Sequence, residues 1–156
     1  SLAAGEGPPP PRPITANDRA FTRMVRNAMF QRVQLAARDD VHGLAQLEAA
    51  AAALTDPPGR VTMNGAAWEE ALGAYWAEYP SMGSGPDARS PELLIVDRSG
   101  AGAASSPRTW TVRQIVEDPE EHRDFQLVAI VDLDASDAAG EPVVRTVSFR
   151  TDQLGA

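Results

Sequence analysis

The segment from Thr109 to Val144 constrains the fold more than any other part of the chain. Every second residue of its first run falls on one side of a pleat: Trp110, Val112, Gln114 and Val116. The same alternation follows a polar turn, at Phe125, Leu127, Ala129, Val131 and Leu133. β-Branched and aromatic residues at period two predict two antiparallel strands with one face on a core.

The second run is apolar on both of its sides. Val128 and Ile130 face away from Phe125 and Leu127. A strand with this pattern is typically central in its sheet and covered on both faces. We therefore expect a helix on one face and a partner or a loop on the other.

Three helical segments precede these strands. Apolar residues at helical spacing make Asp18–Arg38 an amphipathic helix. Val41–Leu54 is a second helix, rich in alanine. Trp68–Tyr79 is a third helix with a broad aromatic face, and Pro80 ends it. The sequence therefore predicts three helices before the sheet.

A short strand at Leu93–Asp97 and a last strand at Val143–Phe149 flank the central pair, with a turn predicted at Ser136–Gly140. Helices that precede an antiparallel sheet indicate an α+β domain. We predict three N-terminal helices packed on a bent antiparallel sheet of about four strands. This order resembles the nuclear transport factor 2-like cone, and a plain two-layer α+β sandwich is the alternative.

The domain organisation follows from the proline content of the N-terminus. Residues 1–13 include four consecutive prolines, Pro8–Pro11, which are typical of an extended linker. We assign residues 14–150 to a single domain and 151–156 to a tail. Such a start is typical of a domain taken from a larger protein.

The composition excludes several classes of chemistry. The chain contains no cysteine, and all 14 of its basic residues are arginines. A Walker A loop and a Schiff base both need a lysine, so neither can form here. No apolar run approaches the roughly 18 residues of a membrane helix. We expect a cytoplasmic protein that carries no cofactor.

Two acidic segments match metal sites only in part. Asp132, Asp134 and Asp137 resemble the start of a calcium loop, but the third acid is displaced. Glu117–His122 gathers four acids and a histidine between two strands, which favours an exposed turn. Neither His122 nor His42 has a serine partner in a nucleophile motif. We predict no catalytic residue and no metal site.

Arginines concentrate on the first helix. Arg19, Arg23 and Arg26 follow i, i+4, i+7 spacing and form one stripe along it. The segment Arg12–Arg38 holds six arginines and one acid, Asp18, in a chain of net charge −8. The stripe would contact RNA phosphates or an acidic partner. The alternative is that these arginines pair with acids of their own domain, such as Asp39, Asp40 and those near Asp118.

Two further binding hypotheses come from the apolar residues. In a cone-shaped fold, helix and sheet can enclose a pocket, lined here by Trp68, Tyr75, Trp76, Trp110 and Phe125. That pocket would make the chain a small enzyme or a ligand-binding protein, with Tyr75 or Asp97 as its ionisable group. Aromatic residues at this spacing otherwise form a core. The outer face of the sheet carries Ile115, Val128 and Ile130, which would pair two copies into a homodimer.

Four segments together resemble one family: Ala16–Phe30, Gly85–Arg89, Trp110–Asp118 and Val131–Arg145. It is the C-terminal domain of unknown function that follows the helicase core in actinobacterial DEAD/DEAH-box superfamily 2 helicases. The resemblance covers Ile14–Phe149. It implies an ATP-dependent RNA helicase as the parent, with the helicase core and RNA as partners. No Walker A, DEAD or DEAH motif is present, so this chain would be the non-catalytic accessory domain.

Overall fold

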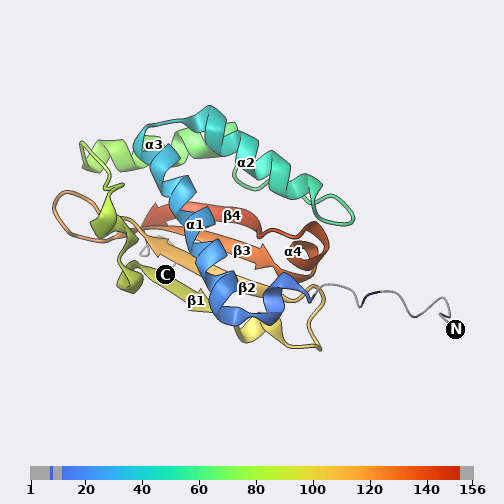
Figure 1. Cartoon of the computed structure of the whole chain (residues 1–156). Coiled ribbons are helices and arrows are strands. Elements are labelled where there is room, and N and C mark those ends of the chain that lie inside the picture. The colour runs from blue at the N-terminus through green and yellow to red at the C-terminus, as the bar shows by residue number, and fades with distance from the viewer. Residues whose placement is uncertain (1–7, 9–11, 152–156) are drawn as a thin grey trace, which may run out of the picture.

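The described part of the chain folds into four helices and four strands, joined in part by short 3-10 turns (Figure 1). The computed structural model describes Pro8 and residues 12–151. The linker predicted at 1–13 and the tail predicted at 151–156 therefore fall almost wholly outside the described residues. The helices are α1 (Asp18–Ala37), α2 (Val41–Ala53), α3 (Gly65–Glu78) and α4 (Leu133–Ala139). The strands are β1 (Leu94–Asp97), β2 (Thr109–Ile115), β3 (Phe125–Asp132) and β4 (Val143–Thr151).

The strands form one antiparallel sheet in the order β1-β2-β3-β4. Val112 lies opposite Ala129, and Leu127 lies opposite Phe149. The predicted meander and the α+β class are therefore confirmed, in a two-layer arrangement of helices and sheet (Figure 1). The likeness to a nuclear transport factor 2-like cone stays a prediction.

Side-chain caps set the starts of the three long helices. The side chain of Asn17 accepts a hydrogen bond from the backbone N–H of Ala20, which begins α1. Asp40 caps α2 in the same way. Asn64 accepts from Ala67 N–H at 2.9 Å, so α3 begins at Gly65, three residues before the predicted start.

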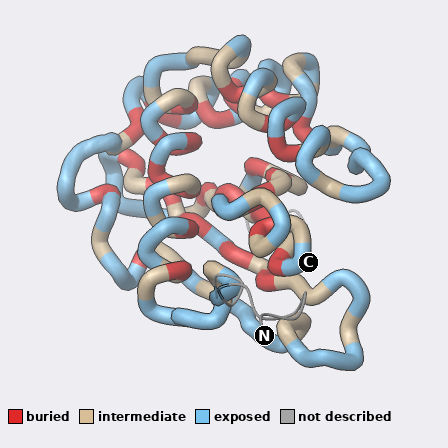
Figure 2. The backbone as a smooth tube through the Cα atoms, turned by 45° about the vertical axis from the view of Figure 1, so that its right-hand side comes forward, coloured by how far each residue is buried: buried red, intermediate tan, exposed pale blue. Residues whose placement is uncertain are grey.

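The core lies between the helices and the inner face of the sheet, where buried segments gather in Figure 2. The ring centroids of Phe21 in α1 and Trp110 in β2 are 5.2 Å apart. Trp68 in α3 packs on Phe149 in β4 at 5.6 Å. The side chains that alternation assigns to the inner face of β2 and β3 are all buried, which confirms that prediction.

The turn predicted at Ser136–Gly140 is wrong, because residues Leu133–Ala139 form α4. The side chain of Asp132 accepts from Ala135 N–H at 2.9 Å and starts the helix at the end of β3. Gly140 ends it in the left-handed region at φ 75°, which glycine adopts without strain. A capping acid ahead of an alanine-rich stretch is the signal that indicates this short helix.

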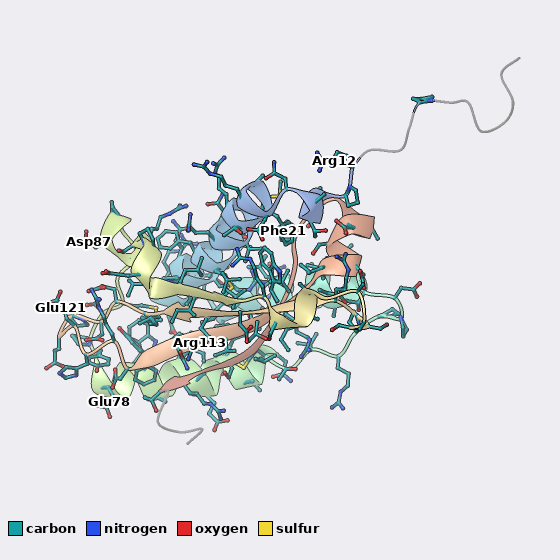
Figure 3. The ribbon with its side chains drawn as sticks, turned by 90° about the horizontal axis from the view of Figure 1, so that it is seen from below. Arg12, Phe21, Glu78, Asp87, Arg113 and Glu121 are labelled. Atoms are coloured by element: carbon teal, nitrogen blue, oxygen red, sulfur yellow. The ribbon has the colours of Figure 1, made fainter. Side chains whose placement is uncertain are left out.

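The outer face of the sheet is more open than the inner face. Val128 and Ile130 in β3 are half-buried, and Ile95 in β1 is 37% exposed. Figure 3 shows Phe21 between α1 and the sheet, and Arg113 on the opposite side of the sheet. The prediction that β3 is fully covered on both faces is therefore confirmed for the inner face only. Within the described residues, no helix is long and apolar enough to cross a membrane.

Candidate binding surface

Helix α1 presents its arginines beside the apolar face that it packs on the sheet. Phe21, Val25 and Met29 are fully buried, which fixes the rotation of the helix. Arg19 and Arg23 are exposed, and Arg26 is half-buried. Among the described residues none of these three arginines takes part in an ion pair. The predicted stripe therefore exists on the surface and keeps its positive charge.

The single acid of this stretch is neutralised by an arginine from elsewhere. Arg98, the residue after β1, donates from Nε to the Asp18 carboxylate at 2.9 Å and from Nη2 to Thr22 Oγ1 at 2.8 Å. Its guanidinium carbon lies 4.5 Å from the centre of the Trp110 ring. Asp18 therefore cannot serve as the counter-charge of Arg19 or Arg23.

A second arginine contacts α1 from the 3-10 turn Pro86–Arg89. Arg89 donates to the side chain of Asn27 at 2.7 Å, and its guanidinium carbon lies 4.8 Å from the centre of the Phe30 ring. Arg89 and Arg98 thus extend the stripe along the same side of the helix. We call these five residues the α1 arginine surface: Arg19, Arg23, Arg26, Arg89 and Arg98.

The alternative that these arginines pair with acids of their own domain is wrong for the acids considered. Asp39 accepts from the indole Nε1 of Trp76 at 3.0 Å, and Asp40 caps α2. Asp118 accepts from three backbone N–H groups of its own loop. These carboxylates satisfy local donors, which leaves the α1 stripe without an acidic partner in the described part of the chain.

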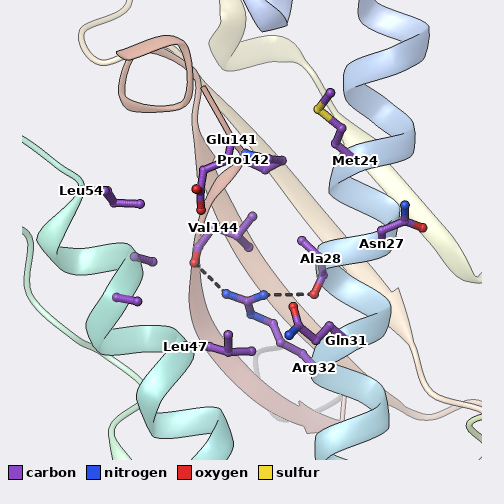
Figure 4. A pocket seen from close by; sticks show the side chains of 12 residues that line it. Met24, Asn27, Ala28, Gln31, Arg32, Leu47, Leu54, Glu141, Pro142 and Val144 are labelled. Atoms are coloured by element: carbon purple, nitrogen blue, oxygen red, sulfur yellow. Dashed lines mark hydrogen bonds between the residues drawn. The ribbon is translucent and has the colours of Figure 1, made fainter. Parts of the chain in front are cut away.

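Arg32, which the sequence analysis does not single out, belongs to the interior. It lies on the floor of a groove of about 300 Å³ between α1, α2 and β4 (Figure 4). Its Nε is 3.3 Å from Glu48 Oε2, and both side chains are almost fully buried. Burial lowers the pKa of Arg32, and the Glu48 carboxylate opposes that change. The readable signal was that both residues occupy apolar-phase positions of their helices, Arg32 near Met29 and Glu48 after Leu44.

The five aromatic residues of the pocket hypothesis lie in and around the core. Trp68, Tyr75, Trp110 and Phe125 are buried, and Trp76 is half-buried against them. None of the four cavities described for residues 12–151 is lined by any of the five. This packing gives the pocket hypothesis no support.

The acids of the partial calcium motif bind protein groups. Asp134 pairs with Arg108 at 2.8 Å, and Asp137 pairs with Arg108 while it accepts from Thr15. Asp132 caps α4. In the part of the chain that the structure describes, no group of three His, Cys, Asp or Glu side chains is placed to hold a metal ion.

A comparison with protein families decides where the chain belongs. The family described as a domain of unknown function, DUF3516, matches residues 2–149. The chain is a DUF3516 domain. No curated protein and no solved structure matches it.

The loop between β2 and β3 of the DUF3516 domain is organised around a buried carboxylate. Asp118 is 2% exposed and accepts backbone hydrogen bonds from Glu120, His122 and Arg123. Burial alone would raise the pKa of Asp118, but these three donors together lower it below the usual 3.8. Of the turn predicted to be exposed at Glu117–His122, residues 119–122 are exposed, Glu117 is half-buried and Asp118 is buried.

Two more side chains of the same loop, His122 and Asp124, form hydrogen bonds with Tyr79 at the end of α3. Tyr79 donates its hydroxyl hydrogen to Asp124 at 2.8 Å, and its oxygen lies 2.9 Å from His122 Nδ1. If Tyr79 donates to Asp124, the hydrogen of the second bond comes from His122. The Tyr79 side chain is buried, and its pKa is raised by that burial and by Asp124. These contacts explain the position of His122 without a catalytic role.

Asp118→Ala is expected to lower the free energy of unfolding by about 2–3 kcal/mol, because three backbone N–H groups lose their acceptor. Urea unfolding at pH 7 measures this change. Because the folded-state pKa of Asp118 is lowered, its contribution is present above pH 3.8 and lost as the pH falls through the folded value. Glu120→Ala, an exposed neighbour, is the control with little expected effect. Equal unfolding midpoints for both variants would contradict the role of Asp118.

Proposed function

We propose that this DUF3516 domain is the non-catalytic C-terminal accessory domain of an actinobacterial ATP-dependent RNA helicase of the DEAD/DEAH-box type. In this proposal it works by binding, and the α1 arginine surface docks on an acidic surface of the helicase core. The resemblance of four segments to that class of domain supports the parent protein. The geometry of α1 supports the mode of action.

The observation that carries the proposal is the unpaired state of Arg19 and Arg23. Four other arginines of the described chain, Arg32, Arg98, Arg108 and Arg123, each bind a carboxylate. The domain is acidic overall, with a net charge of −8, so acids are abundant. Arginines that stay free of them on a helix packed against the core are suited to an acidic partner surface.

An acidic protein surface fits this DUF3516 domain better than RNA does. The net charge of the whole chain repels a polyanion at long range. Binding of single-stranded RNA also relies on exposed aromatic rings that stack on bases. Beside α1, the rings of Trp110 and Phe30 are buried beneath Arg98 and Arg89. RNA binding is therefore the alternative outcome of the test.

The double variant R19E/R23E is expected to bind the separately produced helicase core about tenfold or more weakly than the unchanged domain. Both charges are reversed on one exposed surface, so the ionic part of the affinity is lost. Isothermal titration at several salt concentrations measures the affinity and its salt dependence. The salt dependence should flatten in the variant.

The matched control is R38E/R60E, which makes the same change in net charge at exposed positions outside the surface. Arg26 is left unchanged because its Nε is buried without a hydrogen-bond partner in the described structure, so its replacement would disturb packing. Equal loss of affinity in both double variants would show that only net charge matters and would contradict the proposal. Tight binding of a labelled 20-nucleotide RNA that R19E/R23E abolishes, with no binding to the core, would favour RNA.

A further inference from the structure

The two edges of the sheet differ in how their backbone groups are satisfied. At the β4 edge, Thr146 N–H donates to Glu48 Oε1 at 2.8 Å. Arg32 Nη2 donates to the backbone oxygen of Val144 at 3.0 Å, a bond drawn in Figure 4. The buried Arg32–Glu48 pair therefore occupies the place where a fifth strand would bond. The β4 edge is therefore closed at Val144 and Thr146.

The β1 edge carries backbone groups that β2 does not reach. Val116 N–H donates to Phe125 O, so the even-numbered residues of β2 bond to β3 and the odd-numbered residues bond to β1. In β1, Ile95 and Asp97 lie opposite odd-numbered residues and bond to β2. The backbone groups of Leu94 and Val96 therefore point away from the sheet.

One of these outward groups is already used. Leu94 N–H bonds to Pro91 O in the turn before the strand. The N–H of Val96 and the carbonyl oxygens of Leu94 and Val96 have no backbone or side-chain partner among the described residues. In Figure 1 β1 is the outermost strand on its side of the sheet. Such an edge can pair with an added strand.

The α1 arginine surface borders this edge. Arg98 follows β1 and binds Asp18 and Thr22, and Arg89 precedes β1 and binds Asn27. At about 100° per residue, the three stripe arginines fall between Thr22 and Asn27 around the helix. Their side chains therefore project on the side of α1 that faces the segment from 89 to 98, which contains β1.

We propose that an extended acidic segment of the partner adds to β1 as a fifth strand, with its acidic side chains facing the α1 arginine surface. This inference rests on the proposed function and names the mode by which the partner binds. The added strand would lie about 4.8 Å from β1, and its alternate residues would recur about every 6.7 Å. Arg19 and Arg23 are about 6 Å apart along the helix axis, which matches acids at alternate positions.

Charge argues against a second copy of the chain at this edge. Two β1 strands paired antiparallel would bring both α1 arginine surfaces side by side on the same face, where they repel. Near this edge, Asp18 and Glu92 are already paired with Arg98 and Arg123, and Asp97 in β1 accepts from Ser99 N–H. A partner segment that carries its own carboxylates would neutralise the arginines that have no acidic partner.

The test uses synthetic ten-residue peptides that alternate Glu and Val, capped at both ends and labelled for fluorescence anisotropy. The Glu peptide is expected to bind the unchanged domain at least tenfold more tightly than a matched Lys peptide. A Glu peptide that is N-methylated at its Glu residues keeps every charge but cannot pair with β1 in antiparallel register, so it should bind at least tenfold more weakly than the parent peptide. A Glu peptide that is N-methylated at its Val residues should bind as tightly as the parent. Weak binding of the Val-methylated peptide with tight binding of the Glu-methylated peptide would show parallel pairing.

Equal binding of both methylated peptides and the parent peptide would overturn the strand addition. If R19E/R23E then still abolished binding to the helicase core, the proposed function would stand and only this mode would fall. If R19E/R23E changed neither core nor peptide binding, both would fall. Tight binding of a uridine decamer with no binding of the Glu peptide would overturn the inference in favour of nucleic acid.

Discussion

Glu48→Ala is expected to lower the free energy of unfolding by about 3–5 kcal/mol, the largest loss predicted for a charged residue in this domain. The change leaves the buried guanidinium of Arg32 without its carboxylate. It also removes the acceptor of Thr146 N–H and of the Thr146 hydroxyl. Urea unfolding followed by circular dichroism measures the loss. Since domains of this size are stable by about 5–15 kcal/mol, the variant should be marginally folded.

The double variant R32M/E48M separates closure of the sheet edge from the ion pair itself. Apolar replacement of a whole buried pair is often nearly neutral. Here the backbone groups of Val144 and Thr146 would still lose their partners, so a residual cost of about 2 kcal/mol is expected. Glu69→Ala on the exposed side of α3 is the control. A loss below about 1 kcal/mol for Glu48→Ala would contradict this account.

Tyr75→Ala is expected to cost about 3–5 kcal/mol, because it leaves a cavity at the centre of the aromatic cluster. The Tyr75 ring lies 5.1 Å from Phe125 and 6.1 Å from Phe149, measured between centroids. Tyr75→Phe keeps the ring and loses only the hydrogen bond to Ser81 O, so its expected cost is about 1 kcal/mol. Urea unfolding of the two variants measures both costs.

This pair of variants also tests whether the aromatic residues form a ligand pocket. A residue that lines an open pocket can be truncated at little cost, whereas a core residue cannot. Ala74 is the exposed neighbour in α3, and Ala74→Ser should leave stability nearly unchanged. Similar unfolding midpoints for Tyr75→Ala and Tyr75→Phe would contradict the assignment of Tyr75 to the core.

The sheet could be predicted because its signal is local. The alternation from Trp110 to Leu133 fixes which side chains face the core, and the structure buries those residues. Helix α1 could be predicted equally well, since Phe21, Val25 and Met29 recur at helical spacing. Hydrophobic periodicity of this kind depends only on neighbours in the sequence.

For the candidate site, the positions of the stripe arginines could be predicted from the sequence. Which arginines form ion pairs with which acids could not. The stripe of Arg19, Arg23 and Arg26 follows from spacing alone. Arg98 forms an ion pair with Asp18, 80 residues away in the sequence, because the end of β1 lies against α1. The burial of Arg32 with Glu48 depends likewise on the packing of α1 and α2 on β4. No local pattern contains such pairings.

The availability of loop acids as partners of the arginines depends on local hydrogen bonds. Asp39, Asp40 and Asp118 each accept from a nearer donor. Asp and Asn side chains readily bond backbone N–H groups of their own loop or helix start. The capping positions are visible in the sequence, and they predict which acids are unavailable to distant arginines.

The measurement that tests the binding role most directly is photo-cross-linking, inside cells, in the full-length helicase that we propose as the parent protein. A photoreactive amino acid replaces Arg23 on the α1 arginine surface or, as a control, Glu70 on the exposed side of α3. Mass spectrometry then identifies what each position contacts. The account predicts cross-links from position 23 to an acidic segment of the helicase core and none to it from position 70. Cross-links to the core from position 70 alone, or to RNA alone from position 23, would contradict it.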